Sequence, residues 1–230
     1  MKSKIIALGD SIIKGVVLNI EENGKMHYVL TNNTIVDQMA NKMHLEAVNL
    51  GKMGCTIQTG EQILDRNIEL MNDAKYALLC FGNNDCDYYW RAIATNPKGE
   101  HHPKTPISVF EKAYARIIDK LRKAGVTPII MTMPTMDAER YCQFVSSVLS
   151  EEEKRNLNKW LKTGAEAIWA GHELYNDAIK RIAAAVDAQL VDVSSIWKNT
   201  SKCLCVDGVH PNAEGLKTIG EAIVSSLQHS

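Results

Sequence analysis

Short apolar runs recur along this chain, and most are followed by a stretch with helical periodicity. The runs are almost continuously apolar, which is typical of strands that are covered on both faces. They predict five strands, over Lys4–Leu8, Ala47–Leu50, Tyr76–Phe81, Val126–Met131 and Gln189–Val193. Amphipathic stretches predict helices over Thr34–Met43, Ile57–Met71, Val109–Ala124, Tyr175–Ala185 and Ala213–Leu227. This alternation favours an α/β fold, with a parallel sheet between helices.

Two segments exceed this minimal pattern. Residues Val16–Leu30 contain Asn23-Gly24 between apolar-rich arms, which predicts a small hairpin near the carboxyl edge of the sheet. Residues 135–174 predict an added helical segment, whose expected role is a lid or a partner surface. Its Trp160 and Trp169 are expected either at an interface or in the segment's own small core. No linker or repeat divides the chain, so we expect one domain over residues 1–230 with this segment inserted.

Polar clusters follow the predicted strands. Gly9-Asp10-Ser11 follows the first strand, a glycine-containing loop at 51–54 follows the second, and Gly82-Asn83-Asn84-Asp85 follows the third. A loop with Asp207 and His210 lies after the fifth strand and before the last helix. Ligands of parallel sheets bind beyond the carboxyl ends of the strands, so these clusters are expected to meet at one edge.

The side chains at this edge are the parts of a nucleophilic hydrolase. Serine becomes a nucleophile when a base removes its proton, and His210 is the candidate base for Ser11. Asp207 would hold the imidazole in the required tautomer. The backbone N–H groups of Ser11 and Gly54 and the side-chain amide of Asn84 are candidate donors to an oxyanion.

These four blocks resemble those of the GDSL family, also called SGNH hydrolases. The match rests on Gly9-Asp10-Ser11-Ile12, Gly54, Gly82-Asn83-Asn84-Asp85 and Asp207-Gly208-Val209-His210. The resemblance implies a three-layer α/β/α, flavodoxin-like fold with a five-stranded parallel sheet. It also implies hydrolysis of esters or thioesters through an acyl-enzyme without a metal or cofactor. Ser11 would be the nucleophile, Asp207 and His210 would complete a triad, and Ser11, Gly54 and Asn84 would form the oxyanion hole.

The chain departs from the family pattern at one position and leaves one role open. Ile12 stands where the name-giving motif has Leu, a change that does not touch the chemistry. Gly51 is a second glycine in the loop of Gly54 and is the alternative oxyanion donor.

Other classes of protein are less well supported by these motifs. Ile13 stands where the nucleophile elbow of α/β-hydrolases requires glycine, and the first turn lacks the spacing of a dinucleotide-binding loop. Asp10, Asp207 and His210 are too few for a recognisable metal site. The main rival is a non-catalytic carbohydrate- or small-ligand-binding module on the same fold.

The composition of the chain restricts its possible partners and its cellular compartment. The 230 residues are 45% hydrophobic and 23% charged, and 26 basic residues balance 27 acidic ones, so no nucleic-acid partner is expected. No run is long enough to span a membrane, and the apolar stretch near the N-terminus is short for a signal sequence, so we expect a cytoplasmic protein. The six cysteines are expected to be reduced thiols that pack as small hydrophobes.

The substrate is the least determined feature. Tyr88 and Trp90 follow the third block and either line an acyl or sugar pocket or pack beneath a loop. His101 and His102 lie in a loop, either as surface residues or as substrate contacts. Only three phenylalanines occur, which favours small soluble esters, including O-acetylated carbohydrates, over lipid. The sequence leaves open whether the chain forms a homo-oligomer.

Overall fold

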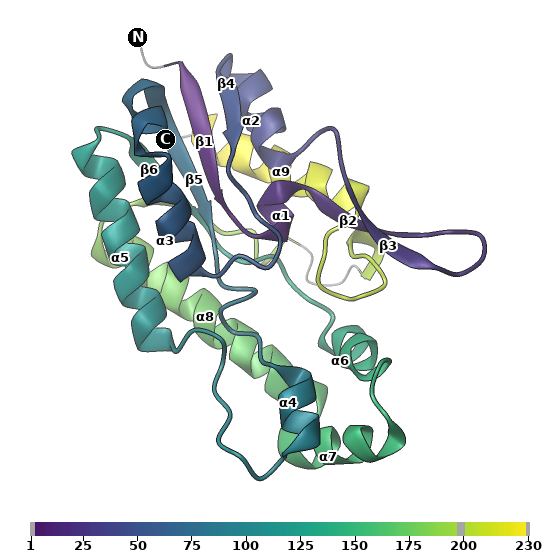
Figure 1. Cartoon of the computed structure of the whole chain (residues 1–230). Coiled ribbons are helices and arrows are strands. Elements are labelled where there is room, and N and C mark those ends of the chain that lie inside the picture. Colours follow the sequence, from purple (N-terminus) through teal and green to yellow (C-terminus); the bar gives the residue numbers. More distant parts are fainter. Residues whose placement is uncertain (1–2, 197–200, 229–230) are drawn as a thin grey trace.

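A five-stranded parallel sheet forms the centre of the protein (Figure 1). The computed structural model describes residues 3–196 and 201–228. In spatial order the strands are β4 (Glu46–Asn49), β1 (Lys4–Gly9), β5 (Ala74–Cys80), β6 (Thr127–Met131) and β7 (Gln189–Val191). This order, with the first strand second in the sheet, is that of the flavodoxin-like doubly wound fold. The predicted fold class is therefore confirmed.

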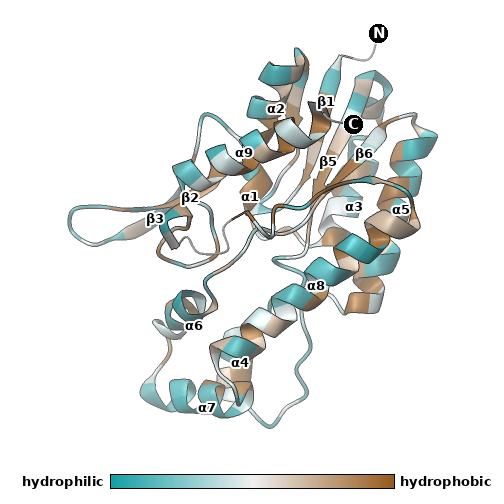
Figure 2. Cartoon of the chain, turned by 180° about the vertical axis from the view of Figure 1, so that it is seen from behind, coloured by the Kyte–Doolittle hydropathy of each residue, from teal (hydrophilic) through white to brown (hydrophobic). Residues whose placement is uncertain are grey.

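Helices cover both faces of this sheet. One layer consists of α2 (Ile35–Met43) and α9 (Ala213–Gln228), and the other of α3 (Ile57–Arg66), α5 (Ile107–Lys123) and α8 (Ala165–Ala185). Successive strand residues alternate between the layers: Ile5 packs with α2 and α9, whereas Ile6 packs with α3, α5 and α8. Figure 2 shows the strands β1, β5 and β6 as hydrophobic, which explains why the predicted strands read as continuous apolar runs.

The predicted elements differ from the observed ones mainly at their ends. The helix predicted over Ile57–Met71 stops at Arg66, where the Asn67 side chain donates to the Ile63 carbonyl, and a 3-10 helix, η1 (Ile68–Asp73), follows. The helix α8 begins ten residues earlier than its predicted start at Tyr175. Its first half packs outside the sheet, where the amphipathic pattern that marks a sheet-covering helix is absent.

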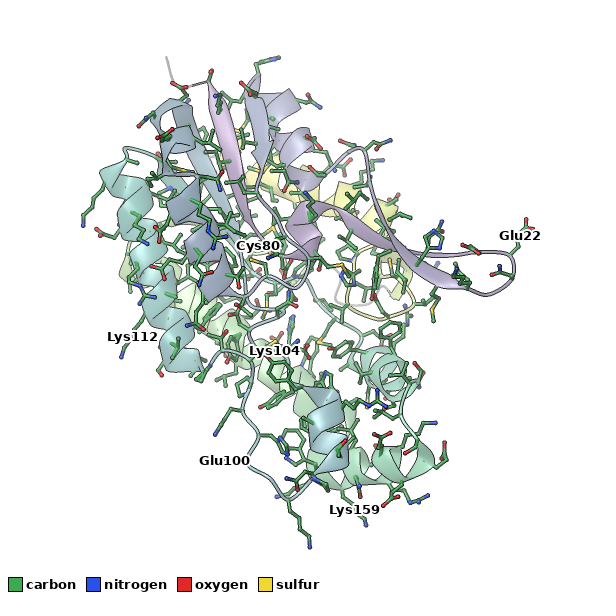
Figure 3. The ribbon with its side chains drawn as sticks, in the orientation of Figure 1. Glu22, Cys80, Glu100, Lys104, Lys112 and Lys159 are labelled. Carbon is green, nitrogen blue, oxygen red and sulfur yellow. The ribbon has the colours of Figure 1, made fainter. Side chains whose placement is uncertain are left out.

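The predicted hairpin is present and lies near the carboxyl edge of the sheet. Strands β2 (Val16–Ile20) and β3 (Met26–Leu30) pair antiparallel, with Gly24 in the turn at a φ of 80°. The hairpin leaves the sheet directly after α1 (Ser11–Lys14) and projects away from the body, with the labelled Glu22 at its tip (Figure 3). Its base stays in contact with the loop that contains Asp207, because the Leu18 N–H lies 3.4 Å from the Cys205 sulfur.

The added segment is helical, as its sequence predicts. It contains α6 (Ala138–Ser146), α7 (Glu151–Leu161) and the first turns of α8, and it lies beyond the carboxyl end of the sheet beside α4 (Trp90–Thr95) (Figure 1). A separate apolar cluster joins α4 and α7, and it includes Ile93, Leu157 and Trp160. Trp160 therefore belongs to a small core of this segment, whereas Trp169 is 38% exposed.

Two further findings concern composition. All six cysteines are free thiols, three of them buried, in agreement with their interpretation as small hydrophobes. Among the described residues, no helix combines the length and apolar character needed to cross a membrane.

Two helical glycines give opposite expectations for substitution by alanine. A Cβ atom at Gly60 of α3 would lie 2.3 Å from two ring atoms of the buried Phe81, whereas a Cβ at Gly171 of α8 would meet nothing within 4 Å. Gly60→Ala should lower the free energy of unfolding by about 1–3 kcal/mol through overpacking. Gly171→Ala should raise it by up to about 1 kcal/mol, because alanine favours helix. Urea denaturation followed by circular dichroism measures both, and equal effects of the two changes would contradict this account.

Candidate active site

Ser11 lies where the first strand ends and a short helix begins. The Asp10 side chain caps this helix, with its Oδ1 accepting the Ile12 N–H at 2.9 Å. Ser11 is the first residue of the helix and is 7% exposed. The cap on one side and the buried strand β1 on the other place its hydroxyl at the carboxyl edge of the sheet.

Asp207 and His210 belong to a closed loop before α9. Backbone hydrogen bonds from Cys205 to His210 and from Asn212 to Cys203 bring the two ends of the loop together. The Asn212 side chain then accepts the Gly215 N–H at 3.0 Å and so caps α9, as its position before the helix predicts.

The three predicted catalytic side chains form one hydrogen-bonded chain. The Ser11 hydroxyl lies 2.8 Å from His210 Nε2, and His210 Nδ1 lies 2.7 Å from Asp207 Oδ2. The other carboxylate oxygen, Oδ1, accepts the N–H groups of Val209 and His210, both at 3.0 Å. Because a carboxylate only accepts, Nδ1 is the donor and Nε2 of the neutral ring is free to accept the serine proton.

The electrostatic surroundings keep Asp207 ionised. Burial by itself would raise the pKa of its carboxyl group. The hydrogen bond and charge of His210, together with the backbone N–H groups of Val209 and His210, outweigh burial and lower this pKa below its usual range. An ionised Asp207 stabilises the imidazolium that forms when His210 takes a proton.

Two buried carboxylates join the loops that surround Ser11. Asp10 Oδ2 accepts the side-chain N–H of Asn83 at 2.9 Å, which joins the Ser11 turn to the loop after β5. Asp85 accepts the Ile57 N–H at 3.0 Å, which joins that same loop to the start of α3 and hence to the loop of Gly54. Both carboxylates are fully buried, and burial raises the pKa of each, that of Asp85 to about 6.

The two glycines after β4 have different surroundings. The Gly51 N–H donates to the Asn49 side chain at 2.9 Å, and a Cβ at Gly51 would lie 2.6 Å from the backbone nitrogen of Lys14. Gly54 has a φ of 71°, and a Cβ there would meet nothing within 4 Å. Gly51 is therefore used for close packing, whereas Gly54 faces open space. Asn84, the remaining candidate donor, is half-buried in the loop after β5.

The sequence reasoning missed one residue that touches the triad. The Tyr28 hydroxyl, from β3, donates to Asp207 Oδ2 at 3.5 Å, and the Tyr28 ring lies 5.2 Å from the ring of His210. Burial and the charge of Asp207 raise the pKa of Tyr28 to about 12, so its hydroxyl keeps the proton that it donates. The only signal for Tyr28 was its place in a hairpin expected at this edge.

The added helical segment also supports the catalytic loop. At the start of α6, the Asp137 N–H donates to the Gly208 carbonyl at 2.8 Å. One turn further, the Arg140 guanidinium donates to the Cys205 carbonyl at 3.1 Å. The loop of Asp207 and His210 is therefore held between the hairpin and α6.

The other singled-out residues lie near the site without joining the triad. Tyr88 and Trp90 line a cavity beside it, and the Tyr88 ring also packs against the rings of Trp90 and Trp160, so that a role in binding substrate stays a prediction. His101 contacts the Asn96 carbonyl and packs edge-on at 6.0 Å from the Trp160 ring, and His102 contacts Glu100. Among the described residues, no three His, Cys, Asp or Glu side chains are grouped to hold a metal ion.

A serine, histidine and aspartate in hydrogen-bonded order at the edge of a flavodoxin-like sheet define a serine hydrolase of the α/β/α class. Residues 5–223 match the family model of the GDSL-like lipases and acylhydrolases, and the chain therefore belongs to this family of enzymes. No curated protein matches the chain.

Solved structures share the fold over nearly the whole chain. LAE5, an alpha/beta hydrolase enzyme from the metagenome of Lake Arreo, Spain, is 18% identical with a TM-score of 0.65, covering 98% of this chain and 95% of that one. The acetyl xylan esterase AlAXEase is 18% identical with a TM-score of 0.61, covering 97% and 99%. A catalytic mutant of Axe2, an acetylxylan esterase from Geobacillus stearothermophilus, is 15% identical with a TM-score of 0.61, covering 99% and 96%. At such identities the likeness shows the fold alone.

The contact of Tyr28 with Asp207 predicts a modest role in catalysis. Tyr28→Phe keeps the ring against His210 and removes the donor to Asp207, so kcat/KM for a short ester should fall about threefold to tenfold. Tyr28→Ala also removes the ring and should lower it further. Tyr89→Phe is a matched control, because Tyr89 is 69% exposed and outside the triad. Steady-state kinetics measure all three, and unchanged kinetics in Tyr28→Ala would show that the hairpin does not support the triad.

Burial of Asp85 predicts how stability depends on pH. Its folded-state pKa of about 6 lies above the usual value of about 3.9 for an aspartate, so the folded state keeps a proton that the unfolded state loses between these values. Stability from this group therefore falls as pH rises from about 4 to 6, by about 3 kcal/mol at 1.36 kcal/mol per pKa unit.

Asp85→Asn removes the titrating group and keeps an acceptor for the Ile57 N–H. The stability of the wild type relative to this variant should therefore fall by about 3 kcal/mol between pH 4 and pH 7. Urea denaturation of both proteins across this range measures the difference. A difference that stays constant with pH would show that Asp85 does not titrate in this window.

Proposed function

We propose that this protein hydrolyses carboxylic esters of small soluble substrates through an acyl-enzyme on Ser11. The observation that carries the proposal is the hydrogen-bonded chain from the Ser11 hydroxyl through His210 to Asp207. The geometry disfavours the rival, a non-catalytic binding module, because binding alone does not require an imidazole with its acceptor nitrogen placed on a serine hydroxyl.

In the first half of the reaction, His210 Nε2 removes the Ser11 proton while Oγ attacks the ester carbonyl carbon. The tetrahedral intermediate collapses, the bond to the alcohol oxygen breaks, and the imidazolium returns the proton to the leaving alcohol. In the second half, a water molecule gives its proton to Nε2 and attacks the acyl carbon. The carboxylic acid then leaves, and the proton returns to Ser11 Oγ.

The negative oxygen of each tetrahedral intermediate needs donors. We assign this role to the backbone N–H groups of Ser11 and Gly54 and to the side-chain amide of Asn84. Gly54 is preferred to Gly51 because the Gly51 N–H is already donated to Asn49, whereas Gly54 faces open space. The buried contacts of Asp10 with Asn83 and of Asp85 with Ile57 support this arrangement by fixing all three loops.

The substrate class rests on weaker support than the reaction. Two of the structurally similar proteins are acetyl xylan esterases, which makes O-acetylated carbohydrates a class to test alongside simple acetate esters. A thioester is chemically equivalent at the attacked carbon and belongs to the same screen.

Removal of the nucleophile tests the mechanism. Ser11→Ala should lower kcat for p-nitrophenyl acetate on the order of 10⁶-fold and abolish labelling by a fluorophosphonate probe. Asn84→Ala should retain labelling and lower kcat about a hundredfold to a thousandfold. Ser147→Ala, at an exposed serine, is the matched control and should behave as the wild type. Undiminished hydrolysis by pure Ser11→Ala protein would refute the assignment, and a wild type that neither labels nor hydrolyses would favour the binding module.

A further inference from the structure

The catalytic loop, which contains Asp207 and His210, lies with its backbone directly on the first turn of α6. Gly208 lies between these two residues and has a φ of 75°. A Cβ at Gly208 would lie 2.5 Å from the Asp137 carbonyl oxygen and 2.9 Å from the Tyr141 backbone nitrogen. The Asp137 N–H also donates to the Gly208 carbonyl. Because no side chain separates the two backbones, a shift of α6 would displace the segment that joins the base to its carboxylate.

Helix α6 is held partly by polar contacts. None of its residues, Ala138–Ser146, is fully buried, so no side chain of this helix is enclosed by a hydrophobic core. Its Tyr141 hydroxyl donates to Asp87 Oδ1 at 2.7 Å. Burial and the charge of Asp87 raise the pKa of Tyr141 well above its usual range, so the hydroxyl keeps the proton that it donates. A hydrogen bond to a charged acceptor is about twice as strong as one between neutral groups, which favours this contact as an anchor of α6.

Asp87 joins four parts of the structure. It lies in the loop after β5, which also contains the candidate oxyanion donor Asn84. Besides the α6 hydroxyl, its Oδ1 accepts the Trp90 indole N–H of α4 at 2.7 Å, and its Oδ2 pairs with Lys104 at 2.6 Å. The labelled Lys104 lies at the junction between the sheet and the helical segment (Figure 3). Asp87 makes no hydrogen bond to a triad side chain among the described residues, so its route to the triad by contact runs through Tyr141 and α6.

We propose that Asp87 and Tyr141 are positioning residues for the reaction: they fix α6, and α6 holds the catalytic loop in place. The proposal rests on the serine esterase function above and adds two residues to its machinery. A misplacement of about 1 Å at the reacting groups can lower the rate on the order of a hundredfold, so a small shift of α6 is enough for a measurable effect. The simpler alternative is that the contacts of Asp87 only stabilise the added segment, in which case their loss lowers stability and leaves kcat unchanged.

Removal of one hydroxyl separates these alternatives. Tyr141→Phe keeps the ring and should lower kcat for p-nitrophenyl acetate about threefold to thirtyfold, with KM changed by less than about twofold. The rate of labelling by a fluorophosphonate probe should fall by a similar factor. Tyr89→Phe is the control, because Tyr89 is 69% exposed, and it should behave as the wild type.

Two results with Tyr141→Phe would overturn the proposal. An unchanged kcat in a protein that is less stable to urea would support the purely structural alternative. A higher KM with an unchanged kcat would assign the Tyr141 hydroxyl to substrate binding instead.

Two changes at Asp87 test the acceptor of this hydrogen bond. Asp87→Asn keeps an oxygen for the Tyr141 hydroxyl and removes the charge, whereas Asp87→Ala removes both. The value of kcat should therefore be partly retained in Asp87→Asn and should fall about tenfold to a hundredfold in Asp87→Ala. A folded Asp87→Ala protein with the kcat of the wild type would overturn the proposal.

A double-mutant cycle tests whether the two residues act through one contact. In Asp87→Ala the Tyr141 hydroxyl has lost its acceptor, so the addition of Tyr141→Phe should lower kcat further by less than about twofold. Effects that multiply would show two independent routes and would overturn the assignment to a shared link. Circular dichroism shows that each variant is folded, and kcat and KM of Tyr141→Phe alone decide the matter if the Asp87 variants do not fold.

Failure of this proposal is distinguishable from failure of the esterase function. Hydrolysis by the wild type together with an unchanged kcat in Tyr141→Phe would refute the positioning role and leave the esterase intact. A wild type that neither hydrolyses esters nor reacts with the fluorophosphonate probe would refute both, because there would be no reaction for Asp87 and Tyr141 to support.

Discussion

The catalytic edge depends on buried carboxylates that tie separate loops together. Asp10 caps the Ser11 helix with one oxygen and holds Asn83 with the other, and Asp85 holds the first N–H of α3. Burial raises the pKa of both, a cost in stability that the fold tolerates at this edge. These links add to the sheet itself and to the hydrogen bonds from Lys52 to Gly9 and from Asn49 to Ile13. They matter because hydrolase chemistry requires placement finer than a strand end provides.

A second set of contacts holds the loop of Asp207 and His210. The loop closes on itself through its backbone, and it is contacted by Tyr28 from the hairpin and by Asp137 and Arg140 from α6. The two segments that exceed the minimal α/β pattern are therefore part of the support of the triad. They also bound the space beside it, since residues of α7 and α8 line the cavity there.

Much of the fold and the triad could be predicted because the relevant signals are local. Continuous apolar runs marked the buried strands, Asn23-Gly24 marked the hairpin turn, and polar clusters after the strands marked one edge of the sheet. Helix ends were less predictable: Asn67 terminates α3 through a side-chain bond, and α8 extends into the added segment without the period of a sheet-covering helix. The sequence left open whether Gly51 or Gly54 is the oxyanion donor, because neighbouring residues do not show which glycine is packed against Lys14 and which faces open space.

The sequence by itself predicted the order of strands and helices along the chain. It also indicated that Ser11, Asp207 and His210 form a candidate triad at the carboxyl edge of a parallel sheet. These features follow from side-chain periodicity and turn chemistry, which act between residues close in the chain. Only the tertiary structure decided that Tyr28 contacts Asp207, that α6 supports the catalytic loop, and that the buried Nε2 of His172 has no partner among the described residues. These contacts join residues far apart in the chain, and the path of each connecting segment and its packing against the rest of the molecule determine which distant side chains meet.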